Sequence, residues 1–251
     1  MTRTGYGGAA SYMSRVRFGD FRGGVIATCA ALLAGVAGTA FAQEKSAEAM
    51  AKLNVVLPRP EEEKLALSAA PEHLRAAATL YIFGKNGFEK VRTGTNGFTC
   101  LVNRDAFFYG ASQFKPTCWD RLGATTYVPV MLKTGEMLAR GESFETIKAA
   151  IDAGFANRTF RAPGAGGVAY MLAGDIEVDP LTGTVTRQAF PGHYMLYANH
   201  VTNDQLGFAM DAAKKDRTLP FVTAAGAGAD HGLTYIIAVP GEGHQHAPAP
   251  P

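Results

Sequence analysis

The stretch that decides the fold class is TLYIFGKNGFEKVR, residues 79–92. Its first five residues are rich in β-branched and aromatic side chains, which favour strands. The segment GKNG at residues 84–87 then supplies glycine and asparagine, which most readily adopt the left-handed backbone of a tight reversal. We therefore predict a β-hairpin with strands at residues 79–83 and 88–92.

A second turn, GTNG at residues 94–97, leads into residues 98–103. In that segment Phe98, Cys100 and Val102 alternate with the other side chains, which is the period of a strand. The pattern predicts a three-stranded meander with Cys100 on its third strand.

The period changes to that of a helix between residues 128 and 155. Apolar residues first gather around Met131 and Met137, and a second run begins after Ser143, a favourable N-cap residue. The apolar residues of the second run recur three or four apart, at Phe144, Ile147, Ile151 and Phe155. The two runs predict a helical hairpin packed on the sheet.

Further strands are expected at residues 168–172, 194–198 and 233–239, together with a hairpin over residues 175–188 that turns at DPLTG, residues 179–183. The chain thus runs from strands to helices and back to strands, without regular βαβ alternation. This order indicates an α+β domain on a mostly antiparallel sheet, with the helical hairpin and an N-terminal helix packed on it.

Residues 1–42 have the pattern of a secretory signal peptide. An apolar run from Val25 to Phe41 follows a segment with four arginines and one acid, and it ends at small residues. We predict cleavage between Ala42 and Gln43, which would place the protein in the periplasm or outside a bacterial cell without a stable membrane anchor. An uncleaved anchor, which needs about 20 strongly apolar residues, is the alternative, and Met13 is an alternative start to Met1.

Beyond the leader we predict a flexible arm at residues 43–58, a single globular domain at residues 59–240 and a disordered tail with proline and histidine at residues 241–251. A helix is expected to begin at Pro60, because proline suits the first turn of a helix. The three glutamates at residues 61–63 also suit the positive end of the helix dipole.

Removal of the leader leaves 209 residues with 20 Lys plus Arg and 21 Asp plus Glu, because the leader carries four arginines and one aspartate. A nearly neutral chain without a basic block offers no footprint for nucleic acid. We therefore expect an unknown small molecule or a protein as the partner.

Cys100 and Cys118 are the two cysteines that remain after cleavage. In an oxidising compartment an even pair predicts one structural disulfide. The alternative is a redox-active or nucleophilic thiol, which would usually show a Cys-x-x-Cys spacing or a helix N-terminus, and neither is present.

Histidines near the ends of the predicted C-terminal strands are the best candidates for chemistry. His193 directly precedes one strand and His200 follows it, while His231 precedes the last strand. If these strands are antiparallel, His200 and His231 fall at the same end of the sheet; if they are parallel, His193 and His231 do.

Either histidine pair, joined by Asp204 or Asp230, would offer the nitrogen and oxygen donors of a divalent transition metal. The spacing of these residues matches no established metal motif. A divalent metal is therefore an alternative, and no cofactor is predicted.

A ligand pocket is a second interpretation of the same strand ends. His193, Tyr197 and Asn199 would project from one face of their strand and, with His231, could line a pocket. The structural alternative is a sheet face covered by helices, with the polar groups satisfied by hydrogen bonds. The sequence contains no Gly-x-Ser-x-Gly elbow, and its Gly-rich segment at residues 164–167 lacks the lysine of a phosphate loop.

Three short segments resemble stretches of uncharacterised exported bacterial proteins with no established function. They are TNGFTCLV at residues 95–102, GVAYML at residues 167–172 and HYMLYA at residues 193–198. The resemblance implies an exported globular domain and brings no catalytic residues with it.

Two hypotheses of function follow. The first is a non-enzymatic module that binds a small ligand or a protein partner through the loop between Cys100 and Cys118 and the sheet end near His193 and His231. The second is a hydrolase or metal-dependent enzyme built on the predicted metal set, which is His193, His200, Asp230 and His231. The sequence leaves open whether the protein is an enzyme.

Overall fold

The computed structural model describes residues 45–207, 210–216 and 219–240. The predicted signal peptide, its cleavage site between Ala42 and Gln43, and the predicted tail at residues 241–251 lie outside these residues. Within the described part of the chain, no helix is long and apolar enough to cross a membrane.

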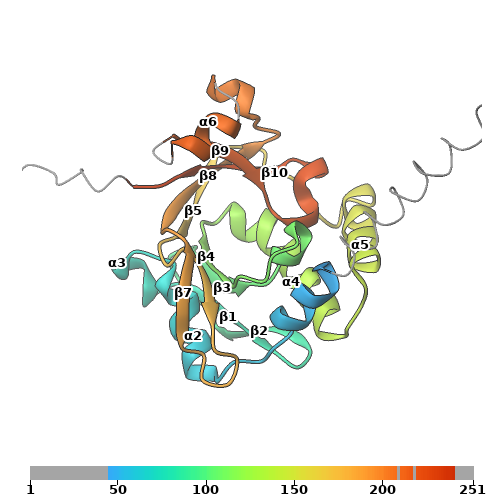
Figure 1. Ribbon diagram of the computed structural model, residues 1–251, viewed down its shortest axis with the longest axis vertical. Helices are drawn as coiled ribbons and strands as arrows, with labels where there is room; N and C mark the ends of the chain where they lie inside the picture. The colour runs from blue at the N-terminus through green and yellow to red at the C-terminus, as the bar shows by residue number, and fades with distance from the viewer. Residues whose placement is uncertain (1–44, 208–209, 217–218, 241–251) are drawn as a thin grey trace, which may run out of the picture. The chain divides into compact units, whose positions relative to one another are not determined.

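Eight strands of the described chain form one sheet, in the order β2-β1-β3-β4-β5-β8-β10-β9 (Figure 1). Its strands are β1 (Thr79–Gly84), β2 (Gly87–Arg92), β3 (Thr99–Asn103), β4 (Lys115–Trp119), β5 (Gly167–Met171), β8 (His193–Asn199), β9 (Phe221–Ala224) and β10 (Leu233–Ala238). All neighbours are antiparallel except β1 and β3. A separate two-stranded sheet consists of β6 (Asp175–Val178) and β7 (Val185–Phe190). The α+β class and the mostly antiparallel sheet are confirmed.

The predicted meander is wrong in one pairing, because β3 pairs in parallel with β1 rather than beside β2. The loop before β3 crosses the start of β1, where the amide of Thr79 donates to the carbonyl of Phe98 at 2.8 Å. Gly94 lies so close to this segment that a Cβ atom there would sit 2.3 Å from the Ala77 carbonyl oxygen. Alternating side chains indicate a strand but not the neighbour with which it pairs.

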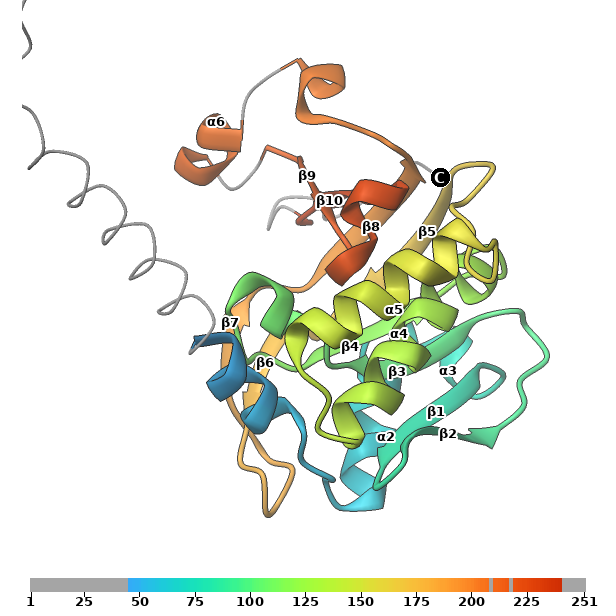
Figure 2. The same ribbon diagram turned by 90° about the vertical axis from the view of Figure 1, so that its right-hand side faces the viewer.

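The predicted helical hairpin is present as α4 (Gly123–Ala139) and α5 (Phe144–Ala156), which lie side by side against the sheet (Figure 2). Ser143 is the N-cap of α5 and accepts a hydrogen bond from the amide of Thr146 at 3.2 Å. The first helix begins five residues before the predicted position. Its first turn is held by Asp120, which accepts from the amide of Gly123 at 2.9 Å.

α2 (Arg59–Ser68) begins one residue before the predicted start at Pro60, and it is followed by α3 (Glu72–Arg75). α2 contacts β1, β3 and β4, whereas α4 contacts β3, β4 and β5. All five residues of β3 are buried, because these two helices cover the two faces of the strand. The shorter helices are η1 (Ala106–Tyr109), η2 (Asn203–Leu206), α6 (Met210–Lys215) and η3 (Gly226–His231).

The prediction of a flexible arm at residues 43–58 is wrong over its described part. Residues 45–53 form a helix, and Ala49, Leu53 and Leu57 are almost fully buried in the core. Ala49 and Leu53 are four apart and so lie on one side of the helix, and Leu57, which follows the helix, is buried in the same cluster. The globular domain therefore includes residues before 59, where the sequence-based boundary was placed.

A buried ion pair fixes this N-terminal segment to the sheet. The guanidinium of Arg104, which follows β3, lies 2.6 Å from the carboxylate of Glu62 on α2, and both side chains are buried. The same guanidinium donates to the carbonyls of Leu53 and Val55, each at 3.0 Å. Arg104 thus joins three segments that are distant in sequence.

Two aromatic rings complete the surroundings of Arg104. The ring centroids of Phe83 and Phe114 lie 4.3 and 4.6 Å from its guanidinium carbon, a geometry that favours cation–π attraction. Burial raises the pKa of the Glu62 carboxyl, and the charge of Arg104 opposes this shift. Removal of either partner would leave the other without its counter-charge in a place that water does not reach.

We expect the substitution Arg104→Met to lower the free energy of unfolding by about 3–5 kcal/mol, because it leaves Glu62 buried without its partner. Urea unfolding followed by the fluorescence of Trp119 measures the change. The double variant Arg104→Met with Glu62→Leu should recover part of this loss, since it removes the uncompensated charge. If the double variant loses as much free energy of unfolding as the two single variants together, the two side chains do not stabilise each other and the pairing is contradicted.

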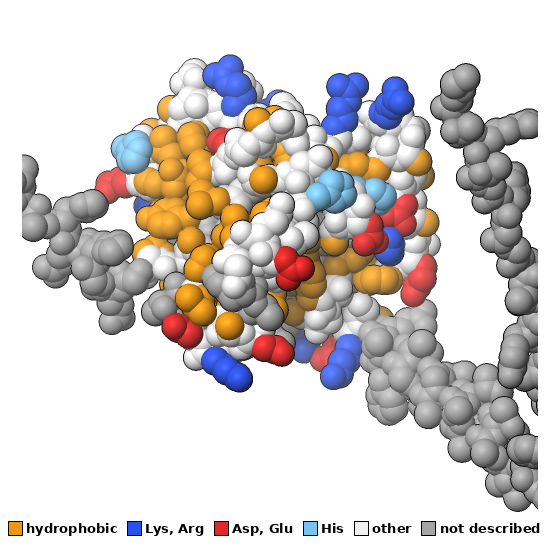
Figure 3. All heavy atoms as spheres, turned by 90° about the horizontal axis from the view of Figure 1, so that it is seen from above, with side chains coloured by type: hydrophobic (Ala, Val, Ile, Leu, Met, Phe, Trp, Pro, Cys, Tyr) orange, Lys and Arg blue, Asp and Glu red, His pale blue; other side chains and the backbone are white. Residues whose placement is uncertain are grey.

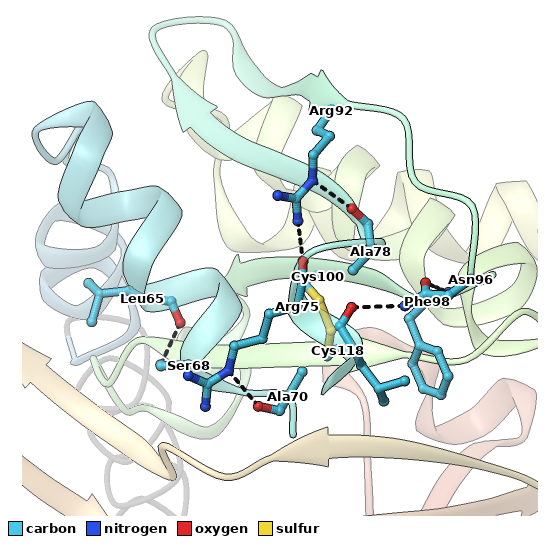
Figure 4. The surroundings of a disulfide bond; sticks show 11 residues. Leu65, Ser68, Ala70, Arg75, Ala78, Arg92, Asn96, Phe98, Cys100 and Cys118 are labelled. Atoms are coloured by element: carbon cyan, nitrogen blue, oxygen red, sulfur yellow. Dashed lines mark hydrogen bonds between the residues drawn. A yellow bond between two sulfur atoms is a disulfide. The ribbon is translucent and has the colours of Figure 1, made fainter. Parts of the chain in front are cut away.

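The predicted disulfide joins β3 to β4 (Figure 4). Cys100 and Cys118 are directly opposite each other in the register, with Cα atoms 4.0 Å apart, and both are fully buried. The bridge therefore closes the segment from residue 100 to residue 118 at its base. Close by, the Arg92 guanidinium donates to the carbonyls of Ala78 and Arg75, at 2.8 and 2.6 Å (Figure 4).

We expect replacement of both cysteines by alanine to lower the free energy of unfolding by about 3 kcal/mol, because the closed loop restricts the unfolded chain. Urea unfolding of the oxidised protein and of the double alanine variant provides the comparison. A reducing agent should destabilise the oxidised protein and leave the alanine variant unchanged. Equal stability of the oxidised protein and the variant would refute a stabilising role.

Candidate functional site

A pocket of about 230 Å³ lies beside β8, β9 and β10. Its apolar wall consists of aromatic and aliphatic side chains, chiefly Tyr109, Met171, Phe190, Phe221, Tyr235 and Ile237. Its polar side chains are Gln113, Lys115, Asp175, His193 and Thr223. These residues come from seven different strands, from η1 and from the loop that follows it, so only the folded chain brings them together.

His193, a predicted ligand-binding residue, lies in this pocket as the first residue of β8. Its Nδ1 atom lies 2.9 Å from the carbonyl oxygen of Pro191, and the ring meets Phe190 edge-on at 5.1 Å. A carbonyl only accepts, so Nδ1 carries the proton of the neutral ring and Nε2 remains an acceptor. Burial lowers the pKa of His193, which favours this neutral form.

Asp175 brings a carboxylate to the pocket from the first position of β6. Among the described residues, no side-chain hydrogen bond to this carboxylate is present. Burial raises the pKa of Asp175, and the neighbouring charge of Asp105 acts in the same direction, whereas Lys115 and His193 oppose it. The carboxylate is thus partly buried and has no fixed donor among the described residues.

Lys115 is the cation of the pocket and is already paired. Its Nζ atom lies 3.4 Å from a carboxylate oxygen of Asp105, and the two side chains are only 14% and 6% exposed. The same Nζ atom lies 4.7 Å from the ring centroid of Tyr109. Asp105 and the aromatic ring therefore hold the ammonium group from two sides.

Two tyrosine hydroxyls close the wall of the pocket near β9. Tyr109 and Tyr235 both donate to the carbonyl of Ala224, the latter at 3.1 Å. Burial raises the pKa of the Tyr235 phenol, so it stays protonated and acts as a donor. This shared carbonyl fixes the orientation of the two rings.

Tyr197, another predicted ligand-binding residue, has a structural role instead. Its side chain is 1% exposed and its hydroxyl donates to Asp120. Asp120 also accepts from the amides of Gly123 and Val168, each at 2.9 Å. The predicted pocket position of Tyr197 is therefore wrong, and the structural alternative of a helix-covered, hydrogen-bonded sheet face applies.

The two faces of β8 differ in burial. Met195 and Tyr197 are buried, whereas Tyr194 and Leu196, which point the other way, are 36% and 48% exposed. Figure 3, viewed from above, shows hydrophobic side chains gathered in patches on the visible surface. The pocket lies on the buried side, since Met171 and Tyr235 of the same core cluster line it.

His231 forms a surface network with α5 at some distance from the pocket. Its Nε2 atom lies 2.8 Å from Asp152, and its ring stacks on Phe155 at a centroid distance of 4.2 Å. Lys148 lies 2.9 Å from Asp152 and 3.8 Å from Asp230. The partners of His231 thus account for its position without a ligand.

The antiparallel pairing of β8 and β10 decides which predicted residues meet. Leu233 is opposite Asn199, so His200 and His231 lie at one end of the sheet. His193 is at the other end of β8, six residues or about 20 Å along the strand. The structure therefore brings Asn199, His200 and His231 near one another and separates them from His193.

The described residues contain no group of three or more His, Cys, Asp or Glu side chains that could hold a metal ion. Asp204 lies on η2, and Asp230 lies on η3 next to His231, before the start of β10 and away from His193. A shared site of His193 with His231 and Asp230 is therefore not formed.

Sequence reasoning missed two charged residues of the pocket, Lys115 and Asp175, and the partner of Lys115, which is Asp105. One usable signal was the run Asn103-Arg104-Asp105, three polar residues at the end of an apolar strand, all of which are buried. The other two residues stand at strand ends, where a polar side chain is common and indicates nothing by itself.

No protein family, curated protein or solved structure matches this chain. The geometry of the described residues therefore carries the functional argument.

The ordinary pKa of histidine is about 6.5. We expect the pKa of His193 to lie below this value, because burial disfavours its charged form. The substitution Asp175→Asn should lower the pKa of His193 further, since the carboxylate favours the imidazolium. NMR titration of the ring Cε1 proton measures both values. A His193 pKa that rises in the variant would contradict the proximity of the two groups.

Proposed function

We propose that this protein is an exported module, periplasmic or secreted, that binds a small molecule in the pocket at the His193 end of the sheet. The pocket is smaller than the usual drug-sized site, so the ligand is a small metabolite rather than a polymer.

The convergence of Lys115, Asp175 and His193 is the observation that carries this proposal. They come from β4, β6 and β8, and each is largely buried or lines the pocket wall. Burial of ionisable groups costs free energy unless partners compensate it, and among these three residues Lys115 forms an ion pair, with Asp105. Groups kept in a cleft at such a cost mark candidate binding sites.

The disulfide loop supports the same conclusion. Asp105, Tyr109 and Lys115 all lie between Cys100 and Cys118, so the bridge closes the segment that forms one side of the pocket. The loop and His193 are parts of the binding surface expected from the sequence. The predicted contribution of His231 is not supported, because it lies beyond the opposite end of β8.

Export is proposed from two independent features. The predicted signal peptide at residues 1–42 directs the chain across a membrane. The buried pair Cys100–Cys118 suits an oxidising compartment, where disulfides persist.

A metal-dependent or other hydrolase receives less support. His193 is separated from His200 and His231 by the length of β8, and the described residues offer no three-ligand cluster. No serine or free thiol lines the pocket as a nucleophile. Binding without chemistry is therefore the function that the geometry favours.

We expect a fragment screen by ligand-observed NMR to find small molecules that bind the wild-type protein and lose binding in Thr223→Trp. Thr223 lines the pocket, so the indole would fill it. The control is Leu181→Ser, at a residue 85% exposed in the β6–β7 turn, which should bind every fragment as the wild type does. If Thr223→Trp retains its fold and all the fragments, the pocket is not the binding site.

A further inference from the structure

We infer that the ligand of this pocket is a small organic amine whose ammonium group is anchored by Asp175. This inference rests on the proposed function and adds to it the charge class of the ligand.

The first argument is the charge balance of the pocket. Asp105 and Lys115 neutralise each other at 3.4 Å. His193 donates through Nδ1 to a backbone carbonyl, and burial lowers its pKa and so favours the neutral ring, whose Nε2 is an acceptor. One carboxylate, that of Asp175, is left in excess, and a monovalent cation restores neutrality.

The second argument is the hydrogen-bonding capacity of Asp175. Within the described residues no donor bonds to its carboxylate, although it can accept several hydrogen bonds. Asp175 is half-buried, and for a carboxylate without protein donors a charge-assisted bond to an ammonium group is among the stronger hydrogen bonds. An ammonium group also has three donors, so one could reach the Nε2 acceptor of His193.

The third argument is the aromatic wall. Phe190 and Phe221 line the pocket, with ring centroids 6.1 Å apart, and Tyr109 already holds the ammonium of Lys115 against its ring. Aromatic faces attract cations and also cover apolar groups. The wall therefore fits an amine with a short apolar or aromatic body.

An anionic ligand fits less well. Its carboxylate would meet the negative charges of Asp105 and Asp175, and the ammonium of Lys115 is already engaged by Asp105 and Tyr109. A neutral alcohol would leave the excess charge of Asp175 uncompensated.

The test compares three probes of similar shape, which are benzylamine, benzyl alcohol and benzoate, titrated into the full chain by NMR. We expect benzylamine to bind most tightly. The substitution Asp175→Asn should weaken benzylamine about tenfold or more, the range of a charge-assisted hydrogen bond, and leave benzyl alcohol unchanged. The matched control Asp230→Asn removes the same charge at the opposite end of β10, where the side chain is 79% exposed, and should change neither affinity.

Stability separates a binding role of Asp175 from a structural one. If its carboxylate serves the ligand, Asp175→Asn should keep or raise the melting temperature without ligand, because a desolvated charge is removed. A marked fall in melting temperature together with unchanged benzylamine affinity would overturn the inference.

The remaining outcomes distinguish this inference from the proposed function. The inference that the ligand is an amine is overturned if benzoate or benzyl alcohol binds more tightly than benzylamine, or if none of the three probes binds. Binding of other fragments that Thr223→Trp abolishes would still support the pocket. The proposed function fails only when the fragment screen finds no ligand sensitive to Thr223→Trp.

Discussion

The fold depends on one guanidinium buried at the end of β3. Arg104 joins the carbonyls of residues 53 and 55 and the carboxylate of Glu62, and thus holds the first described helix, α2 and the sheet in one core. Water does not reach this charge, so protein groups must satisfy it. The next residue, Asp105, pairs with Lys115, which lines the pocket. The same turn of chain therefore sets both the core and one wall of the candidate site.

Local patterns predicted most elements of this fold. The hairpin at residues 79–92, the helix capped by Ser143 and the pair Cys100–Cys118 are each encoded within a few neighbouring residues or by composition. The parallel pairing of β1 with β3 and the packing of residues 45–57 could not be predicted in this way. Both depend on contacts between distant segments, such as those of Arg104, which have no periodic signal.

In the candidate site, too, local patterns predicted some features and contacts between distant segments decided the others. His193 was predicted because histidine is rare and stands at a strand end, and it does line the pocket. His231 has the same kind of signal, and Tyr197 was predicted because it shares a strand face with His193, but these two residues are satisfied by Asp152 and Asp120 in structural networks. The sequence thus shows which residues have a side chain suited to binding. The register of the strands decides whether such a side chain lines the pocket or packs in the core.

Asp175 belongs to a small sheet that is not part of the main one. β6 and β7 pair with each other, and a bridge between Phe114 and Ile176 joins them to the segment before β4. Insertions or deletions in this hairpin would change no rung of the eight-stranded ladder. Changes in the β6–β7 hairpin could therefore alter ligand specificity during evolution, while the eight-stranded sheet that stabilises the domain stays unchanged.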